Sequence, residues 1–166
     1  MRPTSVVFLC TGNTCRSPLT AAIASRAWGD GVRIASAGLQ AVGGQPATEE
    51  ARLVAAERGL DLRDHRSRPI DAALLAGADW VIGMTRAHAA IFRARYGEHF
   101  RGRIGVLGQP GVDLARHEHA PPGEEIPDPF GGDVAAYRAV AEQIERLLTS
   151  WAAEFRGAGA PPEVAP

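Results

Sequence analysis

The chain has 166 residues and a formal net charge of −1, from 18 basic and 19 acidic side chains, and 45% of its residues are hydrophobic. This length suits one globular domain with a core of its own, and two cysteines are too few for a disulfide framework. Balanced, scattered charges argue against a nucleic-acid partner or an anionic membrane surface. The sequence holds no apolar run of about 18 residues and no signal-like beginning, so we expect a cytoplasmic protein without a membrane partner.

Buried strands and helices are predicted to alternate along the chain. Ser5–Cys10 is a run of β-branched and aromatic residues without polar alternation, which is typical of a strand buried on both faces of a parallel sheet. Ser17 and Pro18 then offer an N-cap and a proline for the first helical turn. This alternation predicts an α/β fold, a single-domain doubly wound four-stranded parallel sheet with helices on both faces. The expected strands are 5–10, 32–35, 78–84 and 103–107, and the expected helices are 19–28, 48–58, 71–76, 85–96 and one capped by Asp133 that runs to 155.

Two segments fall outside this alternation. Residues 108–132 are rich in proline and much longer than an ordinary connection, and loops of this length are usually functional or disordered. Residues 157–166 are rich in glycine, alanine and proline, which predicts a flexible C-terminal tail. The predicted domain is therefore 1–156.

The segment between the first strand and the first helix has the character of an anion-binding loop. Ligands of open α/β sheets bind outside the carboxyl ends of the strands, and loop amides that lead into a helix N-terminus converge on a tetrahedral anion. Asn13 is the only asparagine of the chain and follows Gly12, at a point where left-handed backbone geometry is least costly. We expect a phosphate-sized ligand here, and the segment reads Cys10-Thr11-Gly12-Asn13-Thr14-Cys15-Arg16-Ser17-Pro18.

The first residue of this loop is predicted to be a nucleophile. Loop amides and the Arg16 guanidinium give Cys10 a positive environment, which favours its thiolate at neutral pH. With phosphate bound, the sulfur would lie in line with the leaving group while Arg16 grips two equatorial oxygens. Ser17 is placed to donate its hydroxyl to the sulfur. The loop therefore predicts transfer of a phosphoryl group to a cysteine.

A proton for the leaving group is expected from Asp128. Two flanking prolines stiffen Ile126-Pro127-Asp128-Pro129-Phe130, and Phe130 is suited to form a pocket wall. The carboxyl would protonate the leaving atom and, as a carboxylate, would then activate water. An aspartate before proline also favours turns, so a turn-capping role is the alternative. The cycle needs no metal and no cofactor, and we expect neither.

These segments together resemble the low-molecular-weight protein tyrosine phosphatase family over about Ser5 to Leu148. The resemblance is carried by the Cys-x5-Arg-Ser-Pro loop, by the later Asp-Pro-Phe, and by the motifs at 36–38, 65–68 and 78–85. It implies that Cys10 is the nucleophile, Arg16 the transition-state clamp and Asp128 the proton donor. A phosphorylated protein would be the substrate and inorganic phosphate a product.

Within the family, the chain is most similar to the bacterial protein arginine phosphatases. These share Cys-Thr-Gly-Asn-Thr-Cys-Arg-Ser-Pro and Asp-Pro-Phe-Gly-Gly, whereas tyrosine-specific members usually carry a bulky aliphatic residue where this chain has Thr14. No aromatic residue occurs between Gly38 and Pro46, and Gly131 stands where tyrosine-specific members often have a second tyrosine, so a phenol would be clamped less well. Phosphoarginine is the favoured substrate and phosphotyrosine the alternative.

Several alternatives stay open from the sequence alone. Cys15 either fills space in the core or forms a protective disulfide with Cys10 under oxidants. Arg66 and Arg68 either face the site or pair with Asp61 and Asp64 on the surface. The His117-Glu118-His119 run is more typical of a solvated loop than of a metal site. Arsenate reduction is disfavoured because a thiol relay would have only two cysteines, and a non-catalytic phosphoprotein-binding module is disfavoured by the intact candidate residues.

Overall fold

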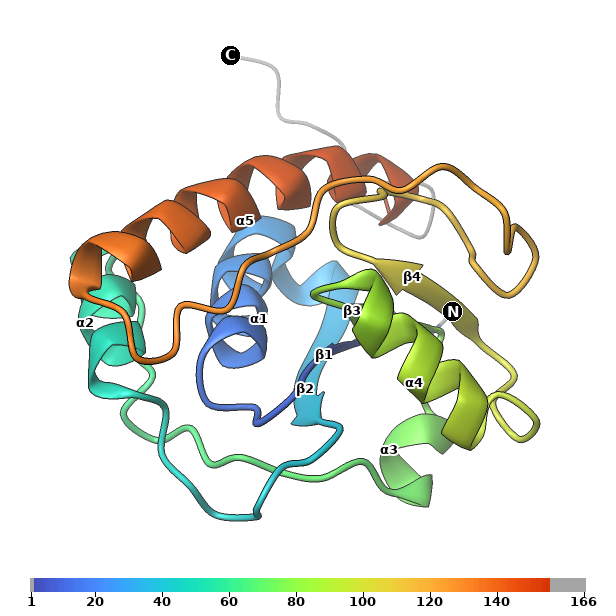
Figure 1. Cartoon of the computed structure of the whole chain (residues 1–166), viewed down its shortest axis with the longest axis horizontal. Coiled ribbons are helices and arrows are strands. Elements are labelled where there is room, and N and C mark those ends of the chain that lie inside the picture. Colours follow the sequence, from blue (N-terminus) through green and yellow to red (C-terminus); the bar gives the residue numbers. More distant parts are fainter. Residues whose placement is uncertain (1, 156–166) are drawn as a thin grey trace.

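Four parallel strands form the centre of the computed structural model, which describes residues 2–155 (Figure 1). Six consecutive residues of the first strand are buried, as its unbroken apolar run predicts. The second strand is longer than expected and reaches Gly38, because it stays in register with the first strand up to the Cys10 pair. The strands are β1 (Thr4–Cys10), β2 (Val32–Gly38), β3 (Trp80–Gly83) and β4 (Arg103–Val106), in the order β2-β1-β3-β4.

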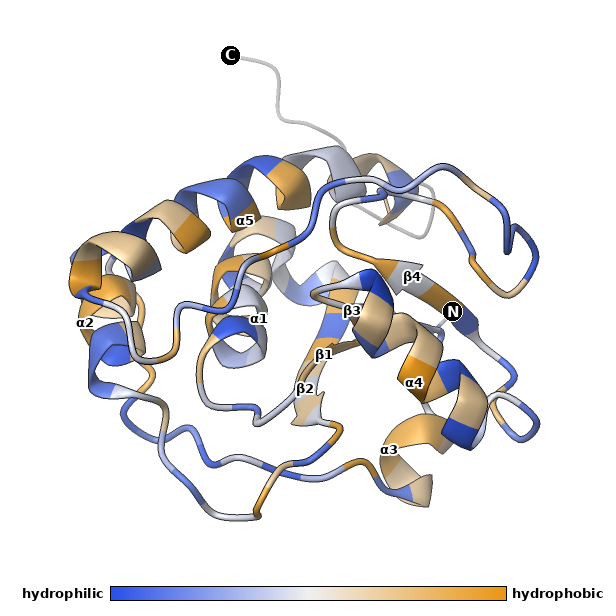
Figure 2. Cartoon of the chain, viewed as in Figure 1, coloured by the Kyte–Doolittle hydropathy of each residue, from blue (hydrophilic) through white to orange (hydrophobic). Residues whose placement is uncertain are grey.

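Helices cover both faces of the sheet and enclose two hydrophobic cores. Val6 and Phe8 of β1 pack toward one face, whereas Val7 and Leu9 pack toward the other, as the two-residue period of a strand requires. Figure 2 shows hydrophobic and hydrophilic residues interspersed along the longest helix, whose buried residues recur every three or four positions. One face carries α1 (Arg16–Trp28), α2 (Glu49–Glu57) and α5 (Val134–Phe155), and the other carries α3 (Ala72–Ala76) and α4 (Arg86–Tyr96).

Most helix starts confirm the sequence prediction, and one corrects it. Side chains at positions 48, 71, 85 and 133 each accept a hydrogen bond from a first-turn amide, so all four act as N-caps. Helix α1, however, begins at Arg16, so Ser17 lies inside its first turn and is not the cap. Cys15 precedes the helix, and no side chain of the described chain caps α1. The capping rule is not followed here because the first-turn amides face the candidate anion loop.

The strand order places the carboxyl ends of β1 and β3 side by side. From β1 the chain passes to β2 at one side and later to β3 at the other, which is the topological switch point where such folds bind ligands. Leu9 pairs with Gly83, so the loops after β1 and β3 leave the sheet together. The long loop before α5 returns to the same point, where the Ile126 amide donates to the Met84 carbonyl at 3.1 Å. Three distant segments thus meet at one edge of the sheet.

Residues 156–166, which include the predicted tail, lie outside the described residues. Within residues 2–155, none of the helices combines the length and the apolar character that a membrane span requires.

Candidate active site

The loop between β1 and α1 is held from outside through its carbonyl groups. The carbonyl of Cys10 accepts the Leu39 amide at 3.0 Å, and that of Thr11 accepts the Gln40 amide at 2.9 Å. The carbonyl of Thr14 accepts the amide that precedes α2 at 2.9 Å. With these carbonyls turned toward neighbouring segments, the first turn of α1 and the loop amides other than that of Asn13, which donates to the Cys10 sulfur, remain available to an anion. This supports the predicted anion loop.

The Cys10 thiol lies at the base of this loop with two hydrogen-bond donors. It is 3% exposed, and its Sγ lies 2.9 Å from Ser17 Oγ and 3.2 Å from the Asn13 backbone nitrogen. Ser17 Oγ accepts a hydrogen bond from Asn13 Nδ2 at 2.8 Å, so the serine proton is free to be donated to the sulfur. The predicted contact between Ser17 and Cys10 is therefore present.

Asn13 holds the loop to neighbouring segments through hydrogen bonds. Its φ of 58° is the one positive φ among the described non-glycine residues, as its place beside Gly12 predicts. The fully buried side chain donates to Ser17 and to Ser36 Oγ at 2.9 Å, and accepts the Arg68 amide at 3.0 Å. His65 Nε2 lies 2.8 Å from the Asn13 carbonyl. Sequence reasoning quoted Ser36 and His65 only as parts of motifs and placed Arg68 either at the site or in a surface ion pair. It missed that all three hold the loop.

Arg16 connects the loop to the segment that carries the predicted proton donor. Its side chain is buried, and Nη1 donates to the Ile126 carbonyl at 3.0 Å. Its Nη2 lies 3.7 Å from Asp128 Oδ2. A buried guanidinium needs such partners, because leaving its donors unpaired away from water is costly. The structure thus brings Arg16 of the loop close to Asp128, which lies 112 positions later in the sequence.

Asp128 makes the turn contact and also faces Arg16. Its Oδ1 accepts the Phe130 amide at 3.1 Å, which is the turn-capping contact considered as the alternative. Its Oδ2 is the atom that faces Arg16, and more than half of the side chain is exposed. Phe130 is 70% exposed at the same turn, so its ring is not packed as the predicted pocket wall. The turn fixes the carboxyl, and the free oxygen faces the guanidinium.

The remaining loop side chains differ in their surroundings. Thr11 is exposed and its Oγ1 lies 3.1 Å from His88 Nε2, a contact that sequence reasoning missed. Half-buried Thr14 has its Oγ1 3.8 Å from Cys15 Sγ, and a Cβ added at Gly12 would lie 3.7 Å from that hydroxyl. The loop is therefore lined by two threonine hydroxyls on its accessible side.

Cys15 points into the core. It is buried, and its sulfur lies 3.4 Å from the Tyr137 hydroxyl. That hydroxyl accepts a hydrogen bond from Thr48 Oγ1 at 3.2 Å, so its own proton is available to the sulfur. Burial is the main cause that raises the pKa of Tyr137 to about 12. Both cysteines are free thiols, and Cys15 fills space in the core as one of its two interpretations predicts.

The side chains of the other polar candidates make their ion pairs away from the loop. Arg68 pairs with Asp71 at 3.2 Å, and Asp61 pairs with Arg63, so the expected pairing of Arg68 with Asp61 or Asp64 is wrong. In the run from 117 to 119, Glu118 lies 3.5 Å from an arginine of α4. Among residues 2–155, no group of three or more His, Cys, Asp or Glu side chains is placed to hold a metal ion.

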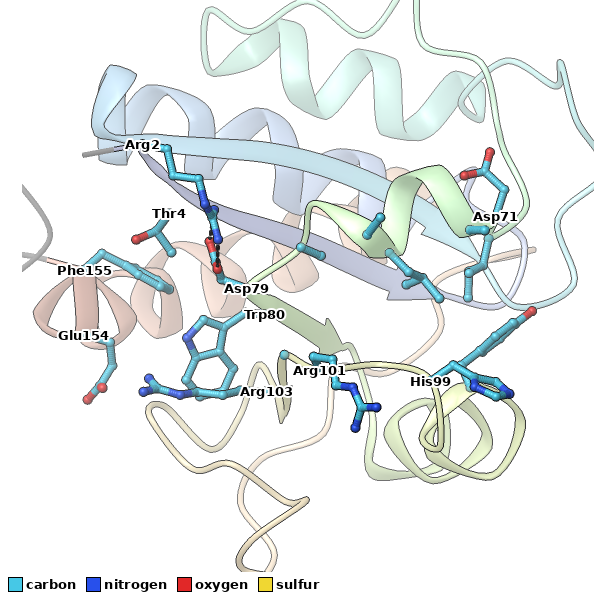
Figure 3. A pocket seen from close by; sticks show the side chains of 17 residues that line it. Arg2, Thr4, Asp71, Asp79, Trp80, His99, Arg101, Arg103, Glu154 and Phe155 are labelled. Atoms are coloured by element: carbon cyan, nitrogen blue, oxygen red, sulfur yellow. Dashed lines mark hydrogen bonds and ion pairs between the residues drawn. The ribbon is translucent and has the colours of Figure 1, made fainter.

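A separate cavity of about 1230 Å³ opens at the amino ends of the strands (Figure 3). Two of its charged groups pair with each other, since Arg2 donates to both oxygens of Asp79 at 2.8 and 2.7 Å. Arg103 lies over the Trp80 ring, 5.4 Å from its centroid. The lining residues of this cavity include none of positions 10–17, so it is not the site of the predicted chemistry.

Comparison with known proteins agrees with this geometry. Residues 5–159 match the family model of low molecular weight phosphotyrosine protein phosphatase. A protein-arginine-phosphatase of Geobacillus stearothermophilus is 33% identical over 88% of this chain and 92% of its own length, and one of Bacillus subtilis is 32% identical over 91% and 96%. The tyrosine phosphatase Wzb of Salmonella typhimurium is 31% identical over 89% and 91%.

The solved structures lead to the same family. The YwlE arginine phosphatase of Geobacillus stearothermophilus superposes with a TM-score of 0.79 at 31% identity, over 93% of this chain and 94% of that one. The tyrosine phosphatase AmsI of Erwinia amylovora does so with a TM-score of 0.77 at 29% identity, over 92% and 93%. The family match spans residues 5–159, which include β1 from Ser5 onward, the loop after it and the last helix. The chain is a protein phosphatase and belongs to the low molecular weight phosphotyrosine protein phosphatase family.

Proposed function

We propose that the enzyme hydrolyses phosphoarginine on proteins through a phosphocysteine at Cys10. The observation that carries this proposal is the pair of donors on the Cys10 sulfur, Ser17 Oγ at 2.9 Å and the Asn13 amide at 3.2 Å. Hydrogen bonds to a thiolate stabilise it as the attacking group and again as the leaving group. The first-turn amides of α1 and the Arg16 guanidinium supply positive potential for the phosphoryl oxygens.

In the first step, the Cys10 thiolate attacks phosphorus while the bond from phosphorus to the guanidinium nitrogen breaks. Asp128 enters this step as the neutral acid and gives its proton to that nitrogen, so arginine leaves in a stable form. Arg16 donates to the equatorial oxygens as the transition state flattens. The products of the step are the free side chain and phosphocysteine.

In the second step, water replaces the sulfur. The Asp128 carboxylate accepts a proton from the water, the water oxygen attacks phosphorus, and the bond from phosphorus to sulfur breaks. Cys10 returns to the thiolate under its two donors, and inorganic phosphate leaves. Asp128 regains the proton that it gave in the first step, so the cycle balances.

The preference for phosphoarginine is supported by the side chains around the loop. Thr14 offers a hydroxyl in place of the bulky aliphatic residue of tyrosine-specific members, and the residue after Phe130 is glycine. A cationic guanidinium is less suited to an apolar slot than a phenol is, because its donors need partners. Two of the most similar relatives are named protein-arginine-phosphatases, whereas others are named tyrosine phosphatases, which makes phosphotyrosine the competing substrate. We also infer that the enzyme works in the cytoplasm.

The test compares kcat/KM for phosphoarginine and phosphotyrosine in the natural enzyme and in Thr14→Ile, with Cys10→Ser as the inactive control. We expect phosphoarginine to lead by tenfold or more, which is about 1.4 kcal/mol of discrimination in the transition state, and Thr14→Ile to reduce that lead. A lead for phosphotyrosine that Thr14→Ile leaves unchanged would reject the assignment to phosphoarginine. Turnover by Cys10→Ser would reject phosphocysteine.

A further inference from the structure

A buried histidine lies directly beneath the anion loop. His88 belongs to the first turn of α4, which follows β3 at the switch point, and it is 5% exposed. A Cβ added at Gly83, the last residue of β3, would lie only 2.9 Å from the His88 Cβ, so the imidazole packs closely against the end of the strand. Its Nε2 lies 3.1 Å from Thr11 Oγ1, in the residue that follows the nucleophile. The proposed chemistry above makes no use of this residue.

The hydrogen bonds of His88 fix which ring nitrogen carries the proton. The Thr85 backbone amide lies 3.2 Å from His88 Nδ1, and the His88 amide donates to Thr85 Oγ1 in return. A backbone amide can only donate, so Nδ1 must present its lone pair. In the neutral ring the proton then lies on Nε2, and Nε2 donates it to the Thr11 hydroxyl oxygen.

The charges around the ring keep it neutral. Burial is the main cause that lowers the pKa of His88 to about 4. Arg16 of α1 lowers the pKa further, and Asp128 of the loop before α5 opposes this with a smaller effect. These are the two charged groups that act on the ring, and Thr11 and Thr85 are its polar neighbours. At neutral pH His88 is therefore a donor at Nε2 and an acceptor at Nδ1.

We propose that His88 is a positioning residue that orients the Thr11 hydroxyl so that its proton is donated to the phosphoryl group in the loop. Because Thr11 Oγ1 accepts from His88, its own proton is free for a different partner. Thr11 is exposed on the accessible side of a loop that binds an anion, so that partner is a phosphoryl oxygen. This inference rests on the proposed phosphoryl chemistry and is independent of which side chain carries the phosphoryl group.

Two substitutions at this position separate the two hydrogen bonds. His88→Asn places an amide oxygen near the position of Nδ1, so it can still accept from Thr85 but is too short to reach Thr11. His88→Gln extends to the position of Nε2, so its amide can donate to Thr11. Thr11→Val removes the hydroxyl with little change in shape. His99→Asn is the matched control, because His99 lines the distant cavity of Figure 3.

The readouts are kcat/KM for an aryl phosphate and the inhibition constant of inorganic phosphate. We expect His88→Asn and Thr11→Val each to lower kcat/KM and weaken phosphate inhibition by about tenfold or more, as for one hydrogen bond to an anion. The variant that carries both substitutions should lose no more kcat/KM or phosphate inhibition than either single variant, since both substitutions remove the same interaction. His88→Gln should recover at least half of the loss, and His99→Asn should match the natural enzyme.

The inference is overturned if His88→Asn lowers the unfolding midpoint yet leaves kcat/KM and the phosphate inhibition constant within twofold of the natural enzyme. It is also overturned if the effects of His88→Asn and Thr11→Val add in the double variant. Nitrogen NMR of the imidazole adds a direct check, with Nε2 protonated and Nδ1 unprotonated at pH 7. A proton found on Nδ1 overturns the inference as well. If instead the natural enzyme prefers phosphotyrosine but phosphate inhibition responds as expected, the substrate assignment fails and the role of His88 stands.

Discussion

Replacing Asn13 tests how much of the loop depends on one side chain. Asn13→Gly keeps the left-handed backbone at no steric cost but removes the hydrogen bonds to Ser17, Ser36 and the Arg68 amide. At about 1 kcal/mol for each bond, this variant should lose about 3 kcal/mol of unfolding free energy. Asn13→Ala removes the same bonds and adds about 1 kcal/mol, because alanine disfavours a φ of 58°.

The same change should slow the reaction, because Asn13 fixes the direction of the Ser17 proton. Without the donor from Asn13, the Ser17 hydroxyl can rotate away from the Cys10 sulfur, and we expect kcat/KM for an aryl phosphate to fall by about tenfold or more, or about 1.4 kcal/mol. Ser36→Ala is the control, since it removes only the outer bond and should cost about 1 kcal/mol of stability with a smaller kinetic effect.

Urea unfolding at 25 °C and steady-state kinetics measure both quantities on the same preparations. The expected order of stability is the natural enzyme, then Ser36→Ala, then Asn13→Gly, then Asn13→Ala. The reasoning is refuted if both Asn13 variants stay within about 1 kcal/mol of the natural enzyme, or if the alanine variant is the more stable of the two.

Three further predictions follow from other contacts. Gly38→Ala should lower stability and activity together, because its Cβ would lie 2.7 Å from the Thr11 carbonyl oxygen and 3.0 Å from the Asn13 nitrogen; unchanged kinetics would contradict this. The unfolding free energy should fall as the pH drops from about 6.5 to about 4, because His88 binds a proton in the unfolded chain but stays neutral in the folded chain. This contribution is about 3 kcal/mol at most, and the unfolding free energy of His88→Asn should lack it over the same pH range. Asp128→Asn should lower kcat far more for substrates with poor leaving groups than for an activated aryl phosphate, and equal losses for both would exclude it as the proton donor.

The local features of the fold were predictable from the sequence because they depend on neighbouring residues. The apolar run of β1, the left-handed Asn13 and the contact of Ser17 with Cys10 all lie within one stretch of 15 residues or fewer. The start of α1 was predicted wrongly, because the rule for Ser17 assumes a side-chain cap and this helix leaves its first amides open.

The supporting contacts of the site could not be predicted in the same way. His88 and Thr11 are 77 positions apart, and Tyr137 and Cys15 are 122 apart. These pairs meet only because β3 lies beside β1 and α5 packs on α1, and no local pattern specifies that order. The sequence did contain one signal for His88, since Thr85 three residues before it forms a reciprocal capping pair with it, but nothing in that spacing indicates the contact with Thr11.

The bond from Arg16 to the Ile126 carbonyl has a consequence for how the molecule folds. It joins the first helix to a loop 110 positions later, so Arg16 and the loop that carries Asp128 come together only after most of the chain has been ordered. Contacts of such sequence separation are entropically costly to close and slow the folding of a domain. Return of turnover during refolding should therefore lag behind the return of helical signal, which makes catalysis a late reporter of native topology.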